Sequence, residues 1–226
     1  AMARGFAEAG ASVLISSRGK EELATATSEL RAGLDAEVEY EVADLSRRSE
    51  ATRLVEAATA RFGKVDILIN NAGINVPQQI DEITDDTWDK MLEVNLSSCM
   101  ALSRGVVPGM KQRRWGRIIY ISSIMGYASK EGRDAYSATK SALLGLCRAN
   151  ALELGIHGIT VNCIAPGPFL TDMPGKMLSD AEKQNFANRT ALLRWGHPNE
   201  LIGPALMMAS DGGGYIGRGP GGGRSR

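Results

Sequence analysis

Short apolar runs alternate along this chain with stretches whose apolar positions recur at helical spacing. Several helical stretches end at a glycine, such as Gly10, Gly63 and Gly155, and glycine is common just beyond a helix C-terminus. This alternation is typical of βαβ units around a parallel sheet. We therefore predict an α/β fold, a Rossmann-like doubly wound parallel sheet in a single domain. The expected strands cover residues 12–16, 38–42, 65–70, 117–122 and 160–164, and the expected helices cover 2–9, 20–33, 49–62, 85–109 and 134–154, with helical stretches near 181–191 and after Pro198.

Composition and charge narrow the class of protein. A length of 226 residues suits one core, since chains divide into several cores only beyond about 250–300 residues. The formal net charge is zero, which gives no electrostatic reason to expect a nucleic-acid or membrane partner. The apolar runs are far shorter than the ~20 residues that cross a bilayer. The cysteines are widely separated and the histidines lack companions at metal-ligand spacing, so we expect free thiols, a cytoplasmic location and no metal.

The strongest chemical signal is a tyrosine and a lysine four residues apart in the expected helix 134–154. At this spacing Tyr136 and Lys140 share one helix face. A free tyrosine, with a pKa near ~10, is a poor proton donor or acceptor at neutral pH. A neighbouring ammonium favours the phenolate and lowers that pKa, which would suit the phenol to general acid or base catalysis. Taken alone, this spacing is common by chance, and the alternative is a surface contact between the two side chains.

Polar and small residues at the ends of two expected strands supply the context. Ser123 follows the strand 117–122 and lies thirteen residues before Tyr136. The carboxyl ends of parallel strands are where α/β active sites form, so this hydroxyl could bind a substrate oxygen beside the tyrosine. Residues 71–73 follow the strand 65–70 in the same way, and small residues there allow a ligand to approach the backbone. Asn95 lies inside the expected helix 85–109, where it either faces the core or is an ordinary solvent-facing residue.

Taken in order along the chain, these motifs resemble those of the short-chain dehydrogenase/reductase family. The similarity covers about residues 3–211, and it is greatest towards 3-oxoacyl-(acyl carrier protein) reductases and gluconate 5-dehydrogenase-like members. The resemblance implies an NAD(P)-dependent enzyme that moves a hydride between a nicotinamide and a ketone or secondary alcohol. The motifs that carry it are Asn71-Ala72-Gly73, Asn95, Ser123, Tyr136 with Lys140, and Pro166-Gly167-Pro168-Phe169-Leu170-Thr171.

The resemblance also implies a role for each residue. Tyr136 would be the general acid in reduction and the base in oxidation, with Ser123 hydrogen-bonded to the substrate oxygen. Lys140 would lower the pKa of Tyr136 and hold the nicotinamide ribose, and Asn95 would hold a water that connects Lys140 to solvent. Further residues would contact the cofactor: Asp44, Leu45, Asn71, Ala72 and Gly73 on the adenosine side, and Pro166, Gly167, Phe169 and Thr171 near the nicotinamide.

The choice between NAD and NADP is expected at the end of the strand 12–16. An acidic residue there would accept hydrogen bonds from the ribose 2′-hydroxyl of NAD. Ser17 and Arg18 stand there instead, and a guanidinium suits a phosphate group. We therefore expect NADP, with NAD as the alternative if Arg18 is only a solvated residue at the start of a helix.

The segment 168–198 is where the resemblance places a substrate lid, and it does not name the substrate. A 3-oxoacyl thioester and a sugar or polyol both remain open. The resemblance further implies a homotetramer or homodimer of the complete protein through the helices 85–109 and 134–154. The large apolar residues of the lid either line a pocket or form the buried face of two helices: Met173, Met177, Leu178, Phe186, Leu192, Leu193 and Trp195.

Both ends of the chain depart from the family pattern. No Gly-rich phosphate turn precedes Ser12, and residues 212–226 are glycine-rich and basic. We expect a catalytic domain over residues 1–211 without the family's first and last strands, followed by a disordered tail. The strands 12–16 and 65–70 would then each have an unpaired edge. The alternatives to an active enzyme are a fragment that binds cofactor poorly and a non-catalytic member retained for binding or assembly.

Overall fold

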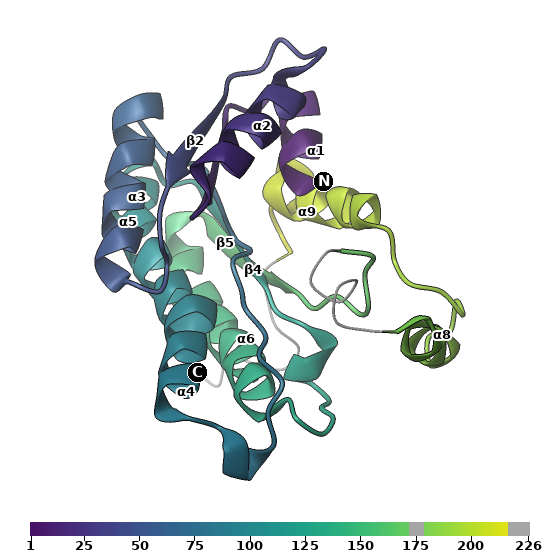
Figure 1. The fold of residues 1–226 in the computed structure, drawn as a ribbon. Helices are drawn as coiled ribbons and strands as arrows, with labels where there is room; N and C mark the ends of the chain where they lie inside the picture. The colour runs from purple at the N-terminus through teal and green to yellow at the C-terminus, as the bar shows by residue number, and fades with distance from the viewer. Residues whose placement is uncertain (172–178, 217–226) are drawn as a thin grey trace.

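A computed structural model describes residues 1–171 and 179–216, and it places helices on both faces of parallel strands (Figure 1). The predicted α/β class is confirmed. The strands are β1 (Val13–Ser17), β2 (Val38–Val42), β3 (Ile67–Asn70), β4 (Gly116–Ile121) and β5 (Ile159–Ile164). The helices are α1 (Met2–Glu8), α2 (Lys20–Arg31), α3 (Arg48–Phe62), α4 (Asp85–Leu92), α5 (Ser98–Arg113), α6 (Asp134–Leu154), α8 (Asp180–Asn188) and α9 (Ile202–Ala209).

The parallel strands are divided between two sheets. β1 pairs with β2, with Val13 opposite Val38, and a second sheet has the order β3-β4-β5. A partner strand would have to lie about 4.8 Å away to pair with the second edge of β1 or of β3. Among the described residues, no strand pairs with either of these edges. The described chain therefore forms two parallel sheets instead of one continuous sheet. The unpaired edges that were expected at β1 and β3 are present.

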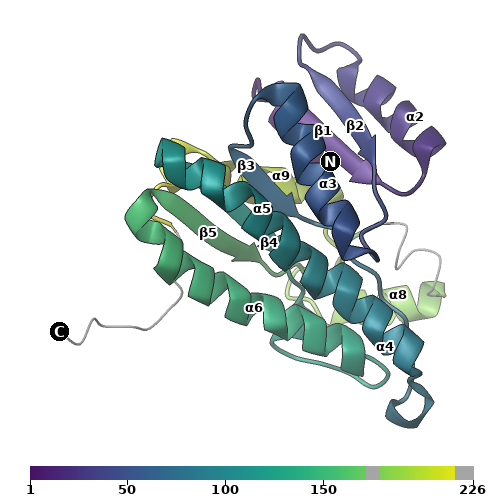
Figure 2. The ribbon, with the colours of Figure 1, turned by 90° about the vertical axis from the view of Figure 1, so that its left-hand side faces the viewer.

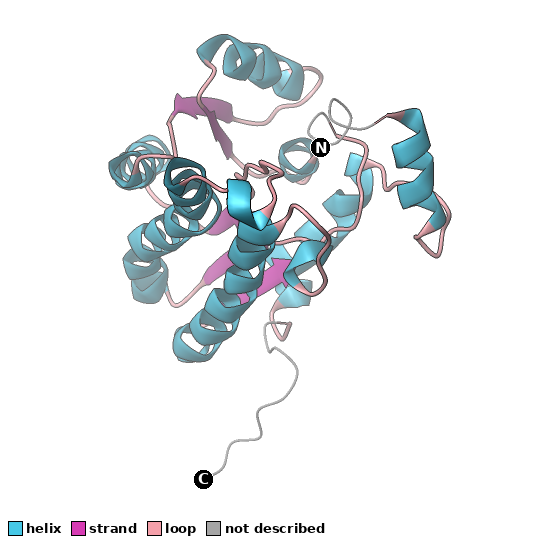
Figure 3. Ribbon diagram, turned by 60° about the horizontal axis from the view of Figure 1, so that its bottom comes forward, coloured by secondary structure: helices cyan, strands magenta, loops and turns pink. Residues whose placement is uncertain are grey.

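The two sheets lie between the same layers of helices. Val13 of β1 and Ile67 of β3 pack against one apolar cluster that includes residues of α1 and α9. On the opposite face, Leu14 of β1 and Leu68 of β3 pack against a cluster from α3 and α5. Figure 2 shows α3, α5 and α6 side by side across this face, and Figure 3 shows helices surrounding the strands. Helix packing on both faces therefore connects the two sheets.

β4 is the most buried strand and leads directly to the candidate site. All six of its residues are buried, which explains why its sequence reads as a nearly continuous apolar run instead of an alternating one. Its Tyr120 is fully buried. The Tyr120 hydroxyl lies 2.7 Å from Ser103 Oγ of α5 and accepts from Asn150 Nδ2 of α6 at 2.8 Å. These bonds tie β4 to the two long helices that cover it.

The expected helix 85–109 is two helices joined by a π-helical turn. The turn covers Glu93–Ser97, and α5 then continues through Pro108 to Arg113. π-helical turns are rare and often lie at functional sites. Here the turn contains Asn95, whose side chain is fully buried, so the solvent-facing alternative for this residue is wrong.

The glycine-rich end of the chain begins inside the described structure. Asp211–Gly213 form a short 3₁₀ helix, and the Asn162 amide donates to the Ile216 carbonyl at 2.9 Å. Residues 217–226, the rest of the expected tail, lie outside the described residues. In the described ranges, no helix is long and apolar enough to cross a membrane, and no three His, Cys, Asp or Glu side chains are grouped so that they could hold a metal ion.

We expect Tyr120→Phe to lower the free energy of unfolding by about 1–2 kcal/mol, because it leaves Ser103 and Asn150 without their shared partner. Urea denaturation measures the change. Tyr127→Phe is the matched control, since Tyr127 is 76% exposed, and it should alter stability by less than about 0.5 kcal/mol. Equal losses in the two variants would contradict a specific role for the Tyr120 hydroxyl.

Candidate active site

The carboxyl ends of β4 and β5 meet the first turn of α6 around one cleft. Ser123 lies two residues beyond β4, and Tyr136 lies in the first turn of α6. Both side chains line the cleft. Ser123 and Tyr136 are thirteen residues apart in the sequence, and the segment between β4 and α6 brings them together. The structure places them where they could act on the same substrate oxygen.

Burial dominates the acidity of the Tyr136 phenol. The phenol is largely removed from water, which raises its pKa above the usual value near 10. The Ser123 hydroxyl and the Arg133 guanidinium oppose this shift and lower the pKa. The Lys140 ammonium lies 5.7 Å from the centre of the tyrosine ring, and it does not offset the effect of burial. The direction of the shift is therefore opposite to the expected one, because desolvation outweighs the neighbouring groups.

Lys140 lies one helical turn after Tyr136 in α6 and is only 4% exposed. Its ammonium donates to the Ile121 carbonyl at 2.8 Å, and burial lowers its pKa. The backbone of the same residue is also held, because Ser122 Oγ donates to the Lys140 carbonyl at 2.7 Å. Two bonds thus join this turn of α6 to the end of β4.

Asn95 connects three segments around the site. The Ile74 amide donates to Asn95 Oδ1 at 2.7 Å, and Asn95 Nδ2 donates to the Ile74 carbonyl at 2.9 Å and to Thr139 Oγ1 at 3.1 Å. The side chain therefore fixes the loop after β3 to the π-helical turn and to α6. The structure shows a positioning role for Asn95, while the water expected there stays a prediction.

Gly73 lies beside Lys140 and Asn95. A Cβ atom at Gly73 would lie 3.4 Å from Lys140 Nζ and 3.5 Å from Asn95 Oδ1, so the bare backbone keeps this approach open. An ammonium has three N–H donors, and the described residues supply one acceptor to Lys140, the Ile121 carbonyl. Free donors beside an uncovered backbone fit the ribose hydroxyls of a nicotinamide cofactor. Asn71 and Ala72 precede Gly73 in the same loop.

The residues expected on the adenosine side lie at the carboxyl ends of β1 and β2. Hydrogen bonds from Ser46 lower the pKa of Asp44, and the guanidinium groups of Arg47 and Arg18 lower it further. Arg18 is exposed, and so is Arg47. Arg47 was missed in the sequence analysis, although a second arginine just beyond β2 was the available signal. The four predicted residues at this edge are Ser17, Arg18, Asp44 and Leu45.

The segment after β5 forms another wall of the cleft. The Ile124 amide donates to the Pro166 carbonyl at 3.0 Å, which ties this segment to the residue after Ser123. The predicted residues Gly167, Phe169 and Thr171 line the cleft. The structure therefore gathers this group around Ser123 and Tyr136.

The expected lid residues divide into two sets. Phe186 and Trp195 line the cleft, and their rings meet edge to face with centroids 5.9 Å apart. Leu192 and Leu193 are instead 72% and 66% exposed, so neither lines the cleft nor belongs to a buried helix face. The remaining three, Met173, Met177 and Leu178, lie outside the described residues.

Three polar residues of the cleft were missed in the sequence analysis. Asn75, Lys130 and Arg133 line it together with Ser123 and Tyr136. Arg133 immediately precedes α6 and lies three residues before Tyr136. Residues three apart in or beside a helix lie on one side of it, and this spacing was the signal that could have identified Arg133.

Comparisons with known proteins agree with this geometry. A family model described as short chain dehydrogenase matches residues 1–182. The D-beta-hydroxybutyrate dehydrogenase of Rhizobium meliloti (strain 1021) is 38% identical over 181 residues, which is 80% of this chain and 70% of that protein. The 3-oxoacyl-(acyl-carrier-protein) reductase of Salmonella typhimurium is 36% identical over 218 residues, covering 94% of this chain and 88% of that protein.

Solved structures show the same similarity. The crystal structure of a gluconate 5-dehydrogenase from Burkholderia cenocepacia J2315, in complex with NADP and tartrate, superposes with a TM-score of 0.88 at 31% sequence identity. The match covers 96% of this chain and 85% of that one.

We expect Lys140→Met to leave stability at pH 7 unchanged or to raise it by about 1 kcal/mol, despite the lost bond to Ile121. The folded-state pKa of Lys140 is lowered by burial, so the folded protein binds its proton less readily than the unfolded chain does. Lys140 therefore reduces stability at neutral pH, and this cost disappears as the pH rises above the unfolded pKa of ~10.4.

Urea denaturation at pH 7 and pH 10.5 measures this difference. Lys20→Met, at an exposed position, is the control for removing a positive charge. A loss of more than about 2 kcal/mol in the Lys140 variant at pH 7 would show instead that the buried ammonium stabilises the fold.

Proposed function

Because this chain belongs to the short-chain dehydrogenase family, and is an NAD(P)-dependent oxidoreductase that acts on CH–OH or C=O groups, we propose that it interconverts a ketone and a secondary alcohol with NADP. The observation that carries the proposal is that Ser123 and Tyr136 line a single cleft, with the ammonium of the buried Lys140 5.7 Å from the centre of the Tyr136 ring. These three side chains supply a hydrogen-bond donor, a proton donor or acceptor, and a cation.

Tyr136 exchanges the proton of the substrate oxygen. In reduction the neutral phenol donates its proton to the developing alkoxide, and in oxidation the phenolate accepts the proton of the alcohol. Ser123 holds the same oxygen by a hydrogen bond, which orients it towards the phenol. Asn95 acts as a positioning residue, because it fixes the loop at Ile74 and the Thr139 turn of α6.

The residues beside Lys140 fit a nicotinamide cofactor. Lys140 would hold the ribose hydroxyls, with Asn71, Ala72 and Gly73 lining its path. Pro166, Gly167, Phe169 and Thr171 would lie near the nicotinamide. When bound, the nicotinamide supplies or accepts the hydride. The chain itself supplies the proton transfer and the orientation of both reactants.

NADP is favoured over NAD by the edge at the ends of β1 and β2. Ser17 and Arg18 are exposed where an acidic residue would favour NAD. Arg47 adds a second exposed guanidinium, 3.9 Å from Asp44. Two guanidinium groups at this edge are suited to a 2′-phosphate.

The substrate is a small carbonyl compound or alcohol. The relatives described above include, by name, a hydroxybutyrate dehydrogenase, a 3-oxoacyl reductase and a gluconate 5-dehydrogenase. They support the two classes expected from the sequence, a 3-oxoacyl thioester and a sugar or polyol. Apolar Phe186 and Trp195 on the lid side of the cleft would cover the carbon chain of either.

We also propose that the chain associates with copies of itself through α6. Leu152 and Ile156, at the end of α6 and just beyond it, are 75% and 68% exposed, and large exposed apolar side chains favour a protein contact. A cytoplasmic location is supported by Cys99, Cys147 and Cys163, which are all free thiols.

We expect Tyr136→Phe to lower turnover in both directions by about 100- to 10,000-fold, with Tyr127→Phe as the control. The pKa of Tyr136 lies above its usual value, so the phenol is present throughout pH 6–9 and reduction should not depend on this group there. Oxidation needs the phenolate, so its kcat/KM should rise with pH across the same range.

Initial rates with NADPH and a panel of ketones, and with NADP and the matching alcohols, measure both profiles. NADPH binding without turnover of any ketone would favour the non-catalytic alternative. Undiminished turnover by the Tyr136 variant would exclude the phenol as the proton donor.

We expect Arg18→Asp to reduce the ratio of kcat/KM with NADPH to that with NADH by at least about tenfold, which corresponds to about 1.4 kcal/mol. The substitution replaces a group that attracts the 2′-phosphate with one that repels it. Lys20→Asp, two residues further on and also exposed, is the matched control. An unchanged ratio in the Arg18 variant would exclude Arg18 from the choice of cofactor.

A further inference from the structure

The cleft has a cationic side that the proton transfer does not use. Arg133 and Lys130 line it together with Ser123 and Tyr136. The described lining includes no carboxylate, and within residues 1–171 and 179–216 neither cation forms an ion pair. Glu182 and Glu131 act on Lys130 at longer range, whereas no carboxylate of the described residues acts on Arg133, and an unpaired cation beside a reacting centre indicates that an anion binds there.

Arg133 is the better placed of the two cations. Its Nη1 donates to Asn75 Oδ1 at 3.5 Å, and its backbone forms a bridge with Gln78, so the residue is held at the cleft wall. A guanidinium has five N–H donors, and a neutral amide is the one side-chain acceptor that the described residues supply to it. Burial lowers the pKa of Arg133, and a bound anion would offset that cost of desolvation.

Arg133 also lies within electrostatic range of the proton-transferring group. Its guanidinium lowers the pKa of the Tyr136 phenol, and the two residues are three positions apart at the start of α6. Both side chains also line the same cleft. An anion on Arg133 would therefore lie within a few carbon atoms of a carbon that reacts at Tyr136.

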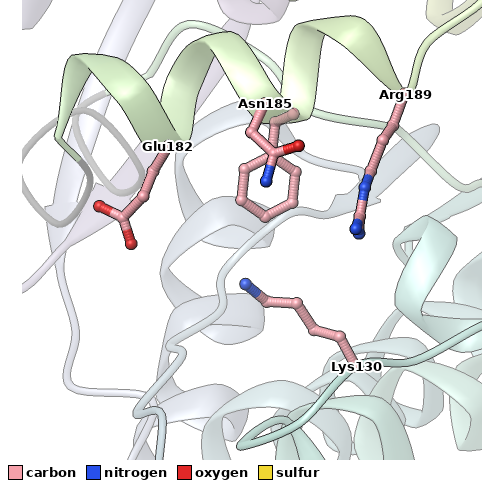
Figure 4. A pocket seen from close by; sticks show the side chains of 5 residues that line it. Lys130, Glu182, Asn185 and Arg189 are labelled. Carbon is pink, nitrogen blue, oxygen red and sulfur yellow. The ribbon is translucent and has the colours of Figure 1, made fainter.

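Lys130 reaches the cleft from the side of the lid. Its Nζ lies 4.6 Å from the centre of the Phe186 ring, and Figure 4 shows it directed towards α8 between Glu182 and Arg189. The Glu182 carboxylate already accepts from Ser179 N at 2.8 Å and from Ser179 Oγ at 2.7 Å. Burial and the Arg133 guanidinium lower the pKa of Lys130, so this cation is the weaker candidate for direct contact with an anion and adds positive charge on the lid side of the cleft.

We propose that the substrate is a short hydroxy or oxo acid with a free carboxylate, and that Arg133, supported by Asn75, binds this carboxylate while Tyr136 and Ser123 hold the reacting oxygen. The inference rests on the proposed function and narrows its substrate class. A carboxylate matches the planar fork of a guanidinium. A phosphate on the carrier arm of a thioester is the other source of an anion, but it lies many bonds from the reacting carbonyl, too far for a group beside Tyr136.

The test compares acids with uncharged counterparts that carry the same reacting group. The pairs are 3-hydroxybutanoate with its methyl ester, and gluconate with sorbitol. We expect kcat/KM to favour at least one acid over its counterpart by about 30-fold, which is typical for a hydrogen-bonded charge. Arg133→Met should remove this preference by lowering kcat/KM for the acid, mainly through KM, far more than kcat/KM for its uncharged counterpart. Arg133→Lys should restore part of the preference.

Arg148→Met is the matched control, since Arg148 is exposed on the same helix, and it should leave the preference intact. Equal losses for acid and ester in the Arg133 variant would show that the guanidinium acts on Tyr136 instead of on substrate, and would overturn the proposal. A preference for 3-oxobutanoyl-coenzyme A over free 3-oxobutanoate that depends on Arg133 would overturn it in favour of the phosphate source.

Tryptophan fluorescence separates this inference from the proposed function, because Trp195 lines the cleft and the titration needs no turnover. We expect 3-hydroxybutanoate or gluconate to change the emission saturably, and we expect Arg133→Met or Trp195→Phe to abolish the change. Binding of this kind without any turnover would contradict the proposed function and support the anion site. Turnover of acid and uncharged partner at equal rates, with no Arg133-dependent binding, would support the function and overturn the anion site.

Discussion

Two hydrogen bonds that join α6 to the end of β4 hold the candidate active site together. The Lys140 ammonium donates to the Ile121 carbonyl at 2.8 Å, and the Ser122 hydroxyl donates to the Lys140 carbonyl at 2.7 Å. Ser123 is the next residue along the chain, and Tyr136 lies one helical turn before Lys140. Because β4 is buried along its whole length, this junction cannot move without disturbing the core. The spacing between the serine and the phenol is therefore set by the packing of the central strand.

The same junction places polar side chains where apolar ones would be easier to bury. Asn95, Thr139 and Lys140 are all at most 4% exposed, and Asn95 donates to the Thr139 hydroxyl at 3.1 Å. A buried polar group is tolerated when its donors and acceptors are satisfied. Asn95 meets this condition through the Ile74 backbone. Lys140 meets it only in part, as is common where a site retains donors for a ligand at some cost in stability.

The formal net charge of zero conceals an uneven distribution of charge around the site. Arg18 and Arg47 are exposed at the ends of β1 and β2, where the phosphate of a cofactor is proposed to bind. Arg133 and Lys130 line the cleft beside Tyr136, where an anionic substrate is proposed. Overall charge therefore says little about the partners of this protein, because the field near a binding site is set by the few groups that surround it.

The alternation of apolar runs and helical periods determined the α/β class, and the five strands were found within one or two residues of their expected positions. Such patterns are local, because each strand or helix needs apolar residues only on the face that it buries. The spacing of Ser123, Tyr136 and Lys140 likewise identified the candidate chemistry, because it resembles the ordered motifs of the short-chain dehydrogenase family.

Other features depended on contacts between residues distant in the sequence. The division of the strands into two sheets, the π-helical turn that buries Asn95, and the cleft positions of Asn75, Lys130 and Arg133 belong to this group. The raised pKa of Tyr136 belongs to it as well, because desolvation depends on everything packed around the phenol. The sequence alone determined which elements form and which side chains are candidates for the chemistry, whereas tertiary packing decided how deeply each group is buried and which charges surround it.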